Sequence, residues 1–158
     1  MRSPRYLPAV TERVEPYDLR LGTPLRWEPN APEAFLVTDD MGRGALAQRA
    51  HPDDTDQRCV VLRWDAVSYS LMSPPNDEGR HHHRLYEVGL KDLLWLGLVR
   101  DSTLVRQLRP MLSGAFAFVP MHYVVVSKEC LVEVLAENVE VFRVAGRTRG
   151  AAPASLSL

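Results

Sequence analysis

The strongest constraint on the fold is the alternation of residue types across positions 58–71. The large apolar residues occupy even positions as far as Trp64 and odd positions from Val67 onward. Because successive side chains of a β-strand point to opposite faces, this alternation predicts a strand over 58–71. A slip of one residue exchanges the two faces of a strand, so the pattern also predicts a bulge or a tight bend at Asp65-Ala66.

The rest of the chain contains shorter apolar runs whose lengths suit strands. One helix is also predicted, because Asp101-Ser102 is an N-cap signal and apolar residues follow it at helical spacing until Pro110. Strands and helices do not alternate regularly, so we expect antiparallel pairing. The predicted fold is mainly β, bordering on α+β: an antiparallel sheet, barrel-like or sandwich-like, with one or two short helices. The further strands are expected at 34–38, 45–50, 93–99, 122–128, 130–136 and 139–144.

Prolines divide the chain into an arm and a domain. Six of the twelve prolines lie within the first 32 residues. A proline ring fixes φ and removes a backbone donor, so this segment cannot form a central strand or a long helix. We expect residues 1–32 to form an extended arm packed on the domain, with at most a short edge strand near 17–21. Residues 33–145 are predicted to form a single β-rich domain, and residues 146–158 a flexible tail.

The charge balance argues against two classes of partner. The 19 basic and 20 acidic residues are interspersed and give a net charge of −1. Nucleic-acid-binding proteins carry a basic stripe and membrane-surface proteins carry polybasic segments, and the sequence shows neither. No apolar run is long enough to span a bilayer and no secretory signal is recognisable, so a soluble cytoplasmic protein is expected.

The polar segment 74–89 is the candidate functional loop. It begins with two prolines, which stiffen it, and contains three of the five histidines in succession. Asn and Asp residues in such a position bond to neighbouring backbone groups and fix the shape of a loop. The alternative is that Asn76 and Asp77 only cap the following turn and that His83 fills a surface groove. We expect the function to centre on this loop, with the leading candidates Asn76, Asp77, Glu78, His83 and Tyr86.

A metal site is a second interpretation of the same loop. On an extended backbone His81 and His83 share a face, Glu87 follows four residues after His83, and His122 comes from a later strand. Zn and Fe accept such a set of ligands. The His-x-His-x-x-x-Glu spacing resembles the first signature of the cupin barrels, and Gly114 and Pro120 repeat the start of the second. The resemblance implies a metal-binding β-barrel. Pro75 and Leu94 stand where the cupins have glycine, which favours a protein without a cofactor.

A second resemblance covers residues 58 to about 140. The string Pro75-Asn76-Asp77-Glu78, the tetrapeptide at 83–86 and Gly89-Leu90 resemble a pattern in a group of small bacterial proteins of unassigned function. His122-Tyr123, followed by a strand with Glu133, completes the pattern. This resemblance implies no reaction and gives Glu87 no special place.

Two functions therefore compete. The chain has no nucleotide-binding glycine motif and no Gly-x-Ser-x-Gly elbow. The first hypothesis is a non-catalytic binding or accessory protein, such as an immunity protein or a pathway partner, that recognises another protein. The alternative is a small-molecule enzyme on a β-barrel, with His81, His83, Glu87 and His122 as metal ligands or acid–base groups. A deep pocket with convergent polar groups would favour the enzyme, and a flat or edge-strand surface would favour the binding protein.

Overall fold

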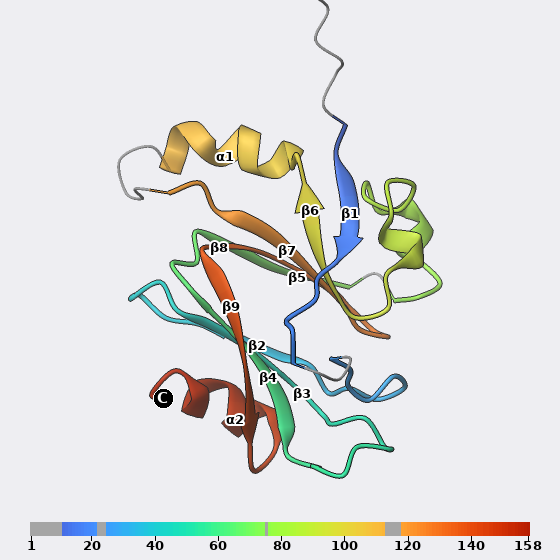
Figure 1. Cartoon of the computed structure of the whole chain (residues 1–158), viewed down its shortest axis with the longest axis vertical. Coiled ribbons are helices and arrows are strands. Elements are labelled where there is room, and N and C mark those ends of the chain that lie inside the picture. The colour runs from blue at the N-terminus through green and yellow to red at the C-terminus, as the bar shows by residue number, and fades with distance from the viewer. Residues whose placement is uncertain (1–10, 22–24, 75, 113–117) are drawn as a thin grey trace, which may run out of the picture.

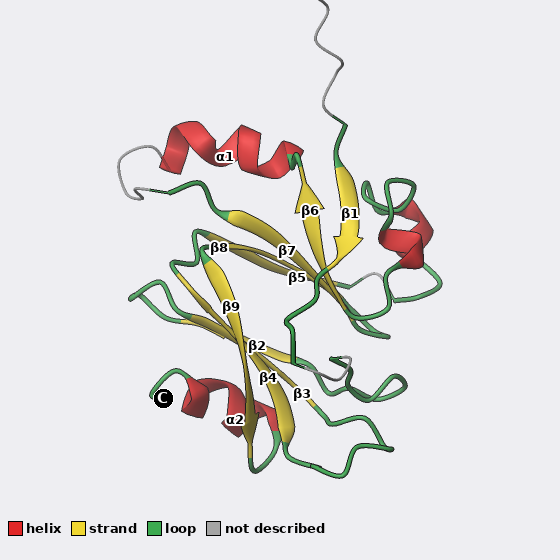
Figure 2. Cartoon of the chain, viewed as in Figure 1, coloured by secondary structure: helices red, strands yellow, loops and turns green. Residues whose placement is uncertain are grey.

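The computed structural model describes residues 11–21, 25–74, 76–112 and 118–158 of the chain. Figure 1 shows the elements along the chain, and Figure 2 distinguishes strands from helices. Two single-turn 3-10 helices, Arg80–His82 and Leu90–Asp92, lie between the fifth and sixth strands. The strands are β1 Arg13–Pro16, β2 Phe35–Thr38, β3 Gly44–Gln48, β4 Cys59–Asp65, β5 Tyr69–Ser73, β6 Leu96–Arg100, β7 Met121–Val126, β8 Leu131–Ala136 and β9 Asn138–Val144, and the α-helices are α1 Thr103–Leu112 and α2 Thr148–Ser155.

The strands form two antiparallel sheets that pack face to face (Figure 2). The five-stranded sheet has the order β1-β6-β7-β8-β5, and the four-stranded sheet has the order β2-β3-β4-β9. The prediction of a mainly β, antiparallel fold with two short helices is confirmed. Of the two architectures expected, the protein has the sandwich-like one, because the sheets do not close into a barrel.

The main core lies between the two sheets. Leu62 and Trp64 of β4 meet Tyr123 of β7 and Val134 of β8 there, and all four side chains are buried. Trp27 closes one end of this core, and its indole Nε1 donates a hydrogen bond to the backbone oxygen of Val126, 3.2 Å away. The alternating residues of the central strands therefore divide between this core and the outer face of each sheet.

The predicted slip at Asp65-Ala66 is a bulge at the corner of the sandwich. Asp65 pairs with Asn138 in the four-stranded sheet, whereas Tyr69 pairs with Leu135 in the five-stranded sheet. Residues 66–68 therefore lie opposite only residues 136–137, and Ala66 adopts a φ of 51°. The expected single strand over 58–71 is instead two strands, because the bend carries its second half into the other sheet.

The C-terminal segment covers the outer face of the four-stranded sheet. The prediction of a flexible tail over 146–158 is wrong, because α2 lies against β2, β3 and β4 (Figure 1). Ala151 and Ala152 are buried against small residues of β3, whose short side chains let the helix approach closely. Arg43 fixes the end of the chain by donating a hydrogen bond from Nη1 to the backbone oxygen of Leu156, 2.6 Å away.

Two segments of the chain pack on the outer face of the five-stranded sheet. Residues 84–93 place Leu85, Leu90 and Leu93 over apolar residues of β6, β7 and β8. The predicted helix is α1, which extends two residues beyond Pro110 and lies across the same face (Figure 1). No residue of α1 is fully buried, so this helix covers the sheet only loosely.

The described part of the predicted arm, residues 11–21 and 25–32, lies along the domain. It supplies an edge strand, but the strand is β1 at Arg13–Pro16 rather than near 17–21. Tyr17 then packs edge-on against Tyr123, with ring centroids 5.5 Å apart. Within the described ranges, no helix combines the length and the apolar character that crossing a membrane requires.

Candidate functional site

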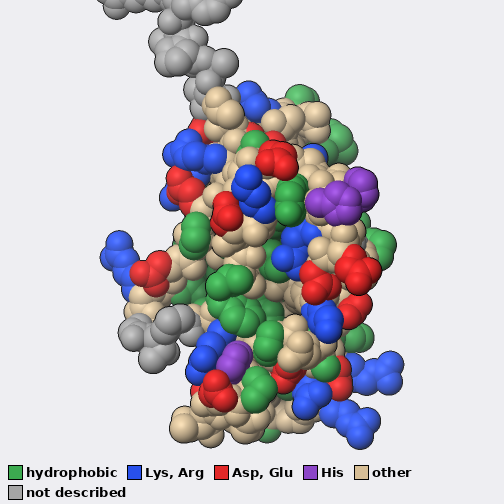
Figure 3. Space-filling model, turned by 90° about the vertical axis from the view of Figure 1, so that its right-hand side faces the viewer, with side chains coloured by type: hydrophobic (Ala, Val, Ile, Leu, Met, Phe, Trp, Pro, Cys, Tyr) green, Lys and Arg blue, Asp and Glu red, His purple; other side chains and the backbone are tan. Residues whose placement is uncertain are grey.

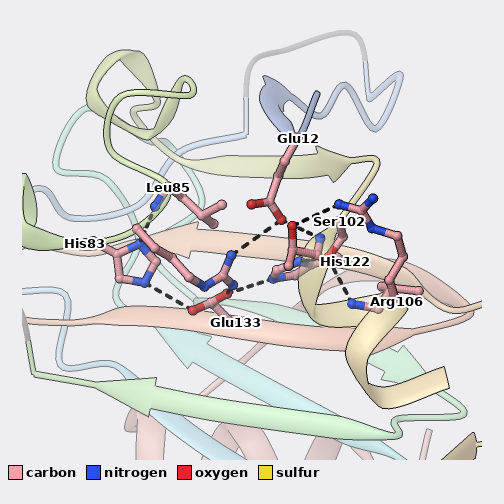
Figure 4. A network of polar contacts seen from close by, with 10 residues as sticks. Glu12, His83, Leu85, Ser102, Arg106, His122 and Glu133 are labelled. Atoms are coloured by element: carbon pink, nitrogen blue, oxygen red, sulfur yellow. Dashed lines mark hydrogen bonds and ion pairs between the residues drawn. The ribbon is translucent and has the colours of Figure 1, made fainter. Parts of the chain in front are cut away.

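Glu133 is the centre of a buried polar network on the outer face of the five-stranded sheet (Figure 4). It is the only charged residue of β8, and it is 4% exposed. His83 Nε2 lies 3.1 Å from Oε1, and His122 Nε2 lies 2.8 Å from Oε2. The Arg84 guanidinium also donates to Oε2. Both oxygens of this carboxylate therefore have donors, which come from three side chains.

The donors keep Glu133 ionised. Burial alone would raise the pKa of Glu133, because it penalises the charged form. Hydrogen bonds from His122 and His83 and the positive charge of Arg84 outweigh burial and hold the pKa of Glu133 well below its ordinary value. A buried carboxylate stays charged only while it is paired and hydrogen-bonded. The charge of Glu133 thus depends on the surrounding loop and strand staying in place.

His122 links Glu133 to the start of α1. Its Nδ1 lies 2.7 Å from Ser102 Oγ, and Ser102 Oγ in turn accepts a hydrogen bond from the backbone N–H of Val105, 3.1 Å away. Neutral His122 with its proton on Nε2 satisfies both contacts, because Nε2 then donates to Glu133 and Nδ1 accepts the Ser102 proton. Ser102 is the predicted N-cap of the helix. One chain of hydrogen bonds therefore runs from α1 through β7 to β8.

The network also reaches the segment before β1. Glu12 Oε1 accepts a hydrogen bond from the backbone N–H of Thr103, 2.7 Å away, and lies 3.5 Å from Arg84 Nη1. Arg84 therefore bridges Glu12 and Glu133. Arg106 adds a hydrogen bond to Thr103 Oγ1 from the next turn of the helix (Figure 4). Segments far apart in the sequence are joined here by polar contacts.

The arrangement is better suited to holding the fold than to catalysis. A hydroxyl, an imidazole and a carboxylate in series can activate a nucleophile, and Ser102, His122 and Glu133 stand in that order. However, Ser102 is 6% exposed, and its oxygen already accepts the hydrogen bond that caps α1. Arg84 and His83 also compete with His122 for the Glu133 charge. The Glu133 carboxylate is therefore shared by three side chains and is not reserved for His122.

The residues predicted from the 74–89 loop take different roles. Asn76 holds the turn, because its Oδ1 accepts a hydrogen bond from the backbone N–H of Gly79, 3.0 Å away. Asp77 and Glu78 are exposed, and Tyr86 is half-buried. His83 joins the Glu133 network through Nε2, while its Nδ1 accepts a hydrogen bond from the backbone N–H of Leu85. Of these five candidates, only His83 belongs to the buried network.

The four predicted metal ligands are not brought together. His81 is exposed and its Nδ1 bonds to the backbone oxygen of Glu78, while Glu87 pairs with Lys91 Nζ at 3.3 Å. His83 and His122 meet only through Glu133. In the part of the chain that the structure describes, no three His, Cys, Asp or Glu side chains are arranged to hold a metal ion. The structure therefore does not bring the cupin-like ligand set together. Gly114 and Pro75 of the cupin-like motifs lie outside the described residues.

Sequence reasoning missed most of the network. In the sequence, Glu133 stands out only through the resemblance to the small bacterial proteins. No sequence pattern marks Arg84, Ser102 or Glu12 as a site residue. The available signal was a single charged residue in the apolar run 130–136, since an unpaired charge in such a strand would be costly to bury. This pattern predicts that Glu133 has a charged or hydrogen-bonding partner, but it does not identify the partner residue.

A separate apolar feature opens at the side of the sandwich. We call it the inter-sheet hollow; its volume is about 710 Å³ and it is lined by residues 16–21, Leu25 and residues 92–96. Leu94 is 71% exposed and Leu21 is 51% exposed, while Tyr17 and Trp95 are half-buried. On the face that carries β1, hydrophobic side chains gather at the surface midway along the molecule (Figure 3). The hollow therefore presents a mainly apolar surface that is partly open to solvent.

Comparison of the chain with protein families, curated proteins and solved structures gave no match.

Proposed function

We propose that the protein is a non-catalytic binding protein that recognises another protein through the inter-sheet hollow. The observation that carries this proposal is the pair of exposed leucines, Leu21 and Leu94, beside a hollow with aromatic and aliphatic walls. Exposed apolar patches of this kind typically mark interaction sites. The occupant is an apolar segment of the partner protein, because the hollow offers apolar contact area rather than convergent polar groups.

The distribution of charge around the hollow supports a protein partner. Asp18, Arg20 and Asp92 line it together with the apolar residues, so charges of both signs border an apolar centre. Protein interfaces have this anatomy, with an apolar core and a polar rim. Trp95 and Tyr17 are also residue types that contribute strongly to binding in such interfaces.

The enzyme alternative has less support. The Ser102, His122 and Glu133 side chains are almost completely buried, and each already has partners inside the fold. The inter-sheet hollow holds no histidine or cysteine among its lining residues. The groups suited to catalysis therefore do not line the inter-sheet hollow.

Site-specific photocrosslinking tests the proposal. A photoreactive phenylalanine analogue is placed at position 94 in the cells that make the protein, and at position 111 as the matched control, because Met111 is 79% exposed but lies on α1. A discrete crosslinked partner is expected from position 94 only. That partner is then purified and titrated with the wild-type protein and with Leu94→Asp and Met111→Asp.

We expect Leu94→Asp to weaken binding at least about tenfold, because the partner would bury an unpaired carboxylate. Met111→Asp should leave the affinity unchanged, and the melting temperature of both variants should stay close to that of the wild type. Equal crosslinking at the two positions, or unchanged affinity for Leu94→Asp, would contradict the proposal. Analytical sedimentation tests a second possibility. If the wild-type protein is a dimer and Leu94→Asp makes it a monomer, the occupant of the hollow is a second copy of this chain and not a different protein.

A further inference from the structure

A second hollow lies between α1 and the end of β6, and we call it the sub-helix hollow. Its volume is about 570 Å³, which is within the range of small-molecule sites. It is lined by residues 98–102, by three residues of α1 and by residues 119–122. On the helix side it is bordered by Val105 of α1, whose side chain is only half-buried.

The charges that line the sub-helix hollow are predominantly positive. Arg100, Arg106 and Arg109 line it, and Asp101 is the only carboxylate among its lining residues. Asp101 is already paired with Arg13 at 3.1 Å, and Arg100 is paired with Glu15 at 3.0 Å. Because Asp101 and Arg100 are already in ion pairs, the charges that remain available to a ligand are the two arginines of α1.

Arg106 and Arg109 form no ion pair with the described residues. They lie three residues apart on α1, which places them on the same side of the helix. Neither has a carboxylate partner among the described residues; Arg106 donates only to Thr103 Oγ1, at 3.1 Å. A guanidinium presents several donors in a fixed plane that matches a carboxylate or a phosphate.

The remaining lining of the sub-helix hollow is mostly apolar and is supported from the sheet. Leu98, Val99 and Met121 supply apolar surface, and Ser102 and His122, which also line the hollow, are held in place by the Glu133 network. A preformed site loses less entropy on binding than one that must be ordered by its ligand. The sub-helix hollow therefore combines two free cations, an apolar wall and a supported inner surface.

We infer that the sub-helix hollow binds a small organic anion. Its oxyanion, a carboxylate or a phosphate, is held by Arg106 and Arg109, and its apolar body packs against Leu98, Val99 and Met121. This inference does not depend on the proposed protein partner, because the two hollows lie at opposite ends of β6: Leu96 lines one and residues 98–100 line the other.

Titration of the purified full-length protein with four probes tests this inference. Benzoate and phenyl phosphate carry the two oxyanions on the same apolar ring, benzyl alcohol is the neutral control, and inorganic phosphate lacks the ring. Calorimetry gives affinities, and amide chemical shifts locate the site. The variants are Arg106→Gln and Arg109→Gln, with Arg149→Gln as the matched control, because Arg149 is an exposed arginine on α2 at the other side of the molecule.

We expect saturable binding of at least one aromatic anion, with shifts concentrated at residues 98–109 and 119–122. Arg109→Gln should weaken it about tenfold, the loss expected for one charge-assisted contact, and Arg149→Gln should not. Whichever of benzoate and phenyl phosphate binds with the higher affinity shows whether the site prefers a carboxylate or a phosphate. The inference is overturned if neither binds below a Kd of about 10 mM, if benzyl alcohol binds equally well, or if inorganic phosphate alone accounts for the affinity. An equal loss in Arg149→Gln would also overturn it.

Discussion

His122 and Glu133 are diagonal neighbours on adjacent strands, because His122 pairs with Leu135 of β8 while Glu133 pairs with Val124 of β7. Their side chains share the outer face of the sheet, and Nε2 approaches Oε2 to 2.8 Å. A one-residue slip between β7 and β8 would break this diagonal contact and send one of the pair toward the inter-sheet core. The polar network and the strand register therefore stabilise each other.

Removing the central charge should destabilise the protein strongly. Glu133→Gln leaves His83, Arg84 and His122 facing an amide that offers fewer acceptors and brings donors of its own. Because breaking a buried ion pair leaves its partners uncompensated, we expect a loss of roughly 2–4 kcal/mol in the free energy of unfolding, measured by urea denaturation. The exposed Glu137→Gln is the control and should change stability by less than about 0.5 kcal/mol. A loss below that value for Glu133→Gln would show that the network contributes little.

The contribution of Glu133 should depend on pH in a defined direction. Its pKa is lowered in the folded protein, mainly because hydrogen bonds from His122 and His83 and the charge of Arg84 overcome the opposing effect of burial. Its stabilisation is therefore complete above the pKa of the unfolded chain, about 4.5, and is lost as the pH falls through the lower pKa of the folded state. The difference in unfolding free energy between wild type and Glu133→Gln should shrink from pH 6 to pH 3. Taking this difference cancels the other acidic groups, and a constant or growing difference would contradict the assignment.

Two glycine substitutions should act in opposite directions. Gly89 has a φ of 124°, and a Cβ there would lie 2.5 Å from the backbone oxygen of Val14. Gly89→Ala should therefore lower the melting temperature and cost about 2 kcal/mol or more, because both the backbone and β1 must shift. Gly150 lies exposed in α2, where an added Cβ meets nothing within 4 Å.

Gly150→Ala should stabilise the protein by about 0.5–1 kcal/mol, the gain expected for alanine over glycine inside a helix. Calorimetric unfolding of the two variants beside the wild type provides the measurement. A neutral Gly89→Ala would mean that β1 is not held as closely to residue 89 as the structure shows.

Ser102 should behave as a helix cap and not as a nucleophile. A fluorophosphonate that labels activated serines should leave Ser102 unmodified, as judged by mass spectrometry of the intact protein and its peptides. Ser102→Ala should cost at least about 1 kcal/mol, because it removes the N-cap and also leaves the buried Nδ1 of His122 without its partner, whereas the exposed Ser157→Ala should have almost no effect. Stoichiometric labelling of Ser102, abolished by His122→Ala, would instead support the enzyme alternative.

Local patterns predicted the strands well where one face is buried. The shift from even to odd apolar positions after Trp64 predicted a bulge or bend at Asp65-Ala66, which the structure shows at 66–68, and the apolar runs predicted the strands β7 and β8. Asp101-Ser102 predicted the start of α1, which Ser102 caps. These features depend on neighbouring residues, so a short stretch of sequence contains the information. By contrast, α2 contains Gly150 and Pro153 and buries only small side chains, so its sequence lacks the large apolar residues that indicate an amphipathic helix and instead suggests a tail.

The amino-acid sequence by itself determined which segments form strands, where the long strand bends and where α1 begins, because alternation and capping are properties of adjacent residues. Only the tertiary structure decided that Glu133 meets His83, 50 residues away, and that His81 and Glu87 stay apart from His122. It also decided that Leu21 and Leu94 border one hollow and that Arg106 and Arg109 line another. Such contacts depend on how the sheets pair and pack. Strand order is set by the total burial of apolar surface over the whole chain, and no single segment carries that information.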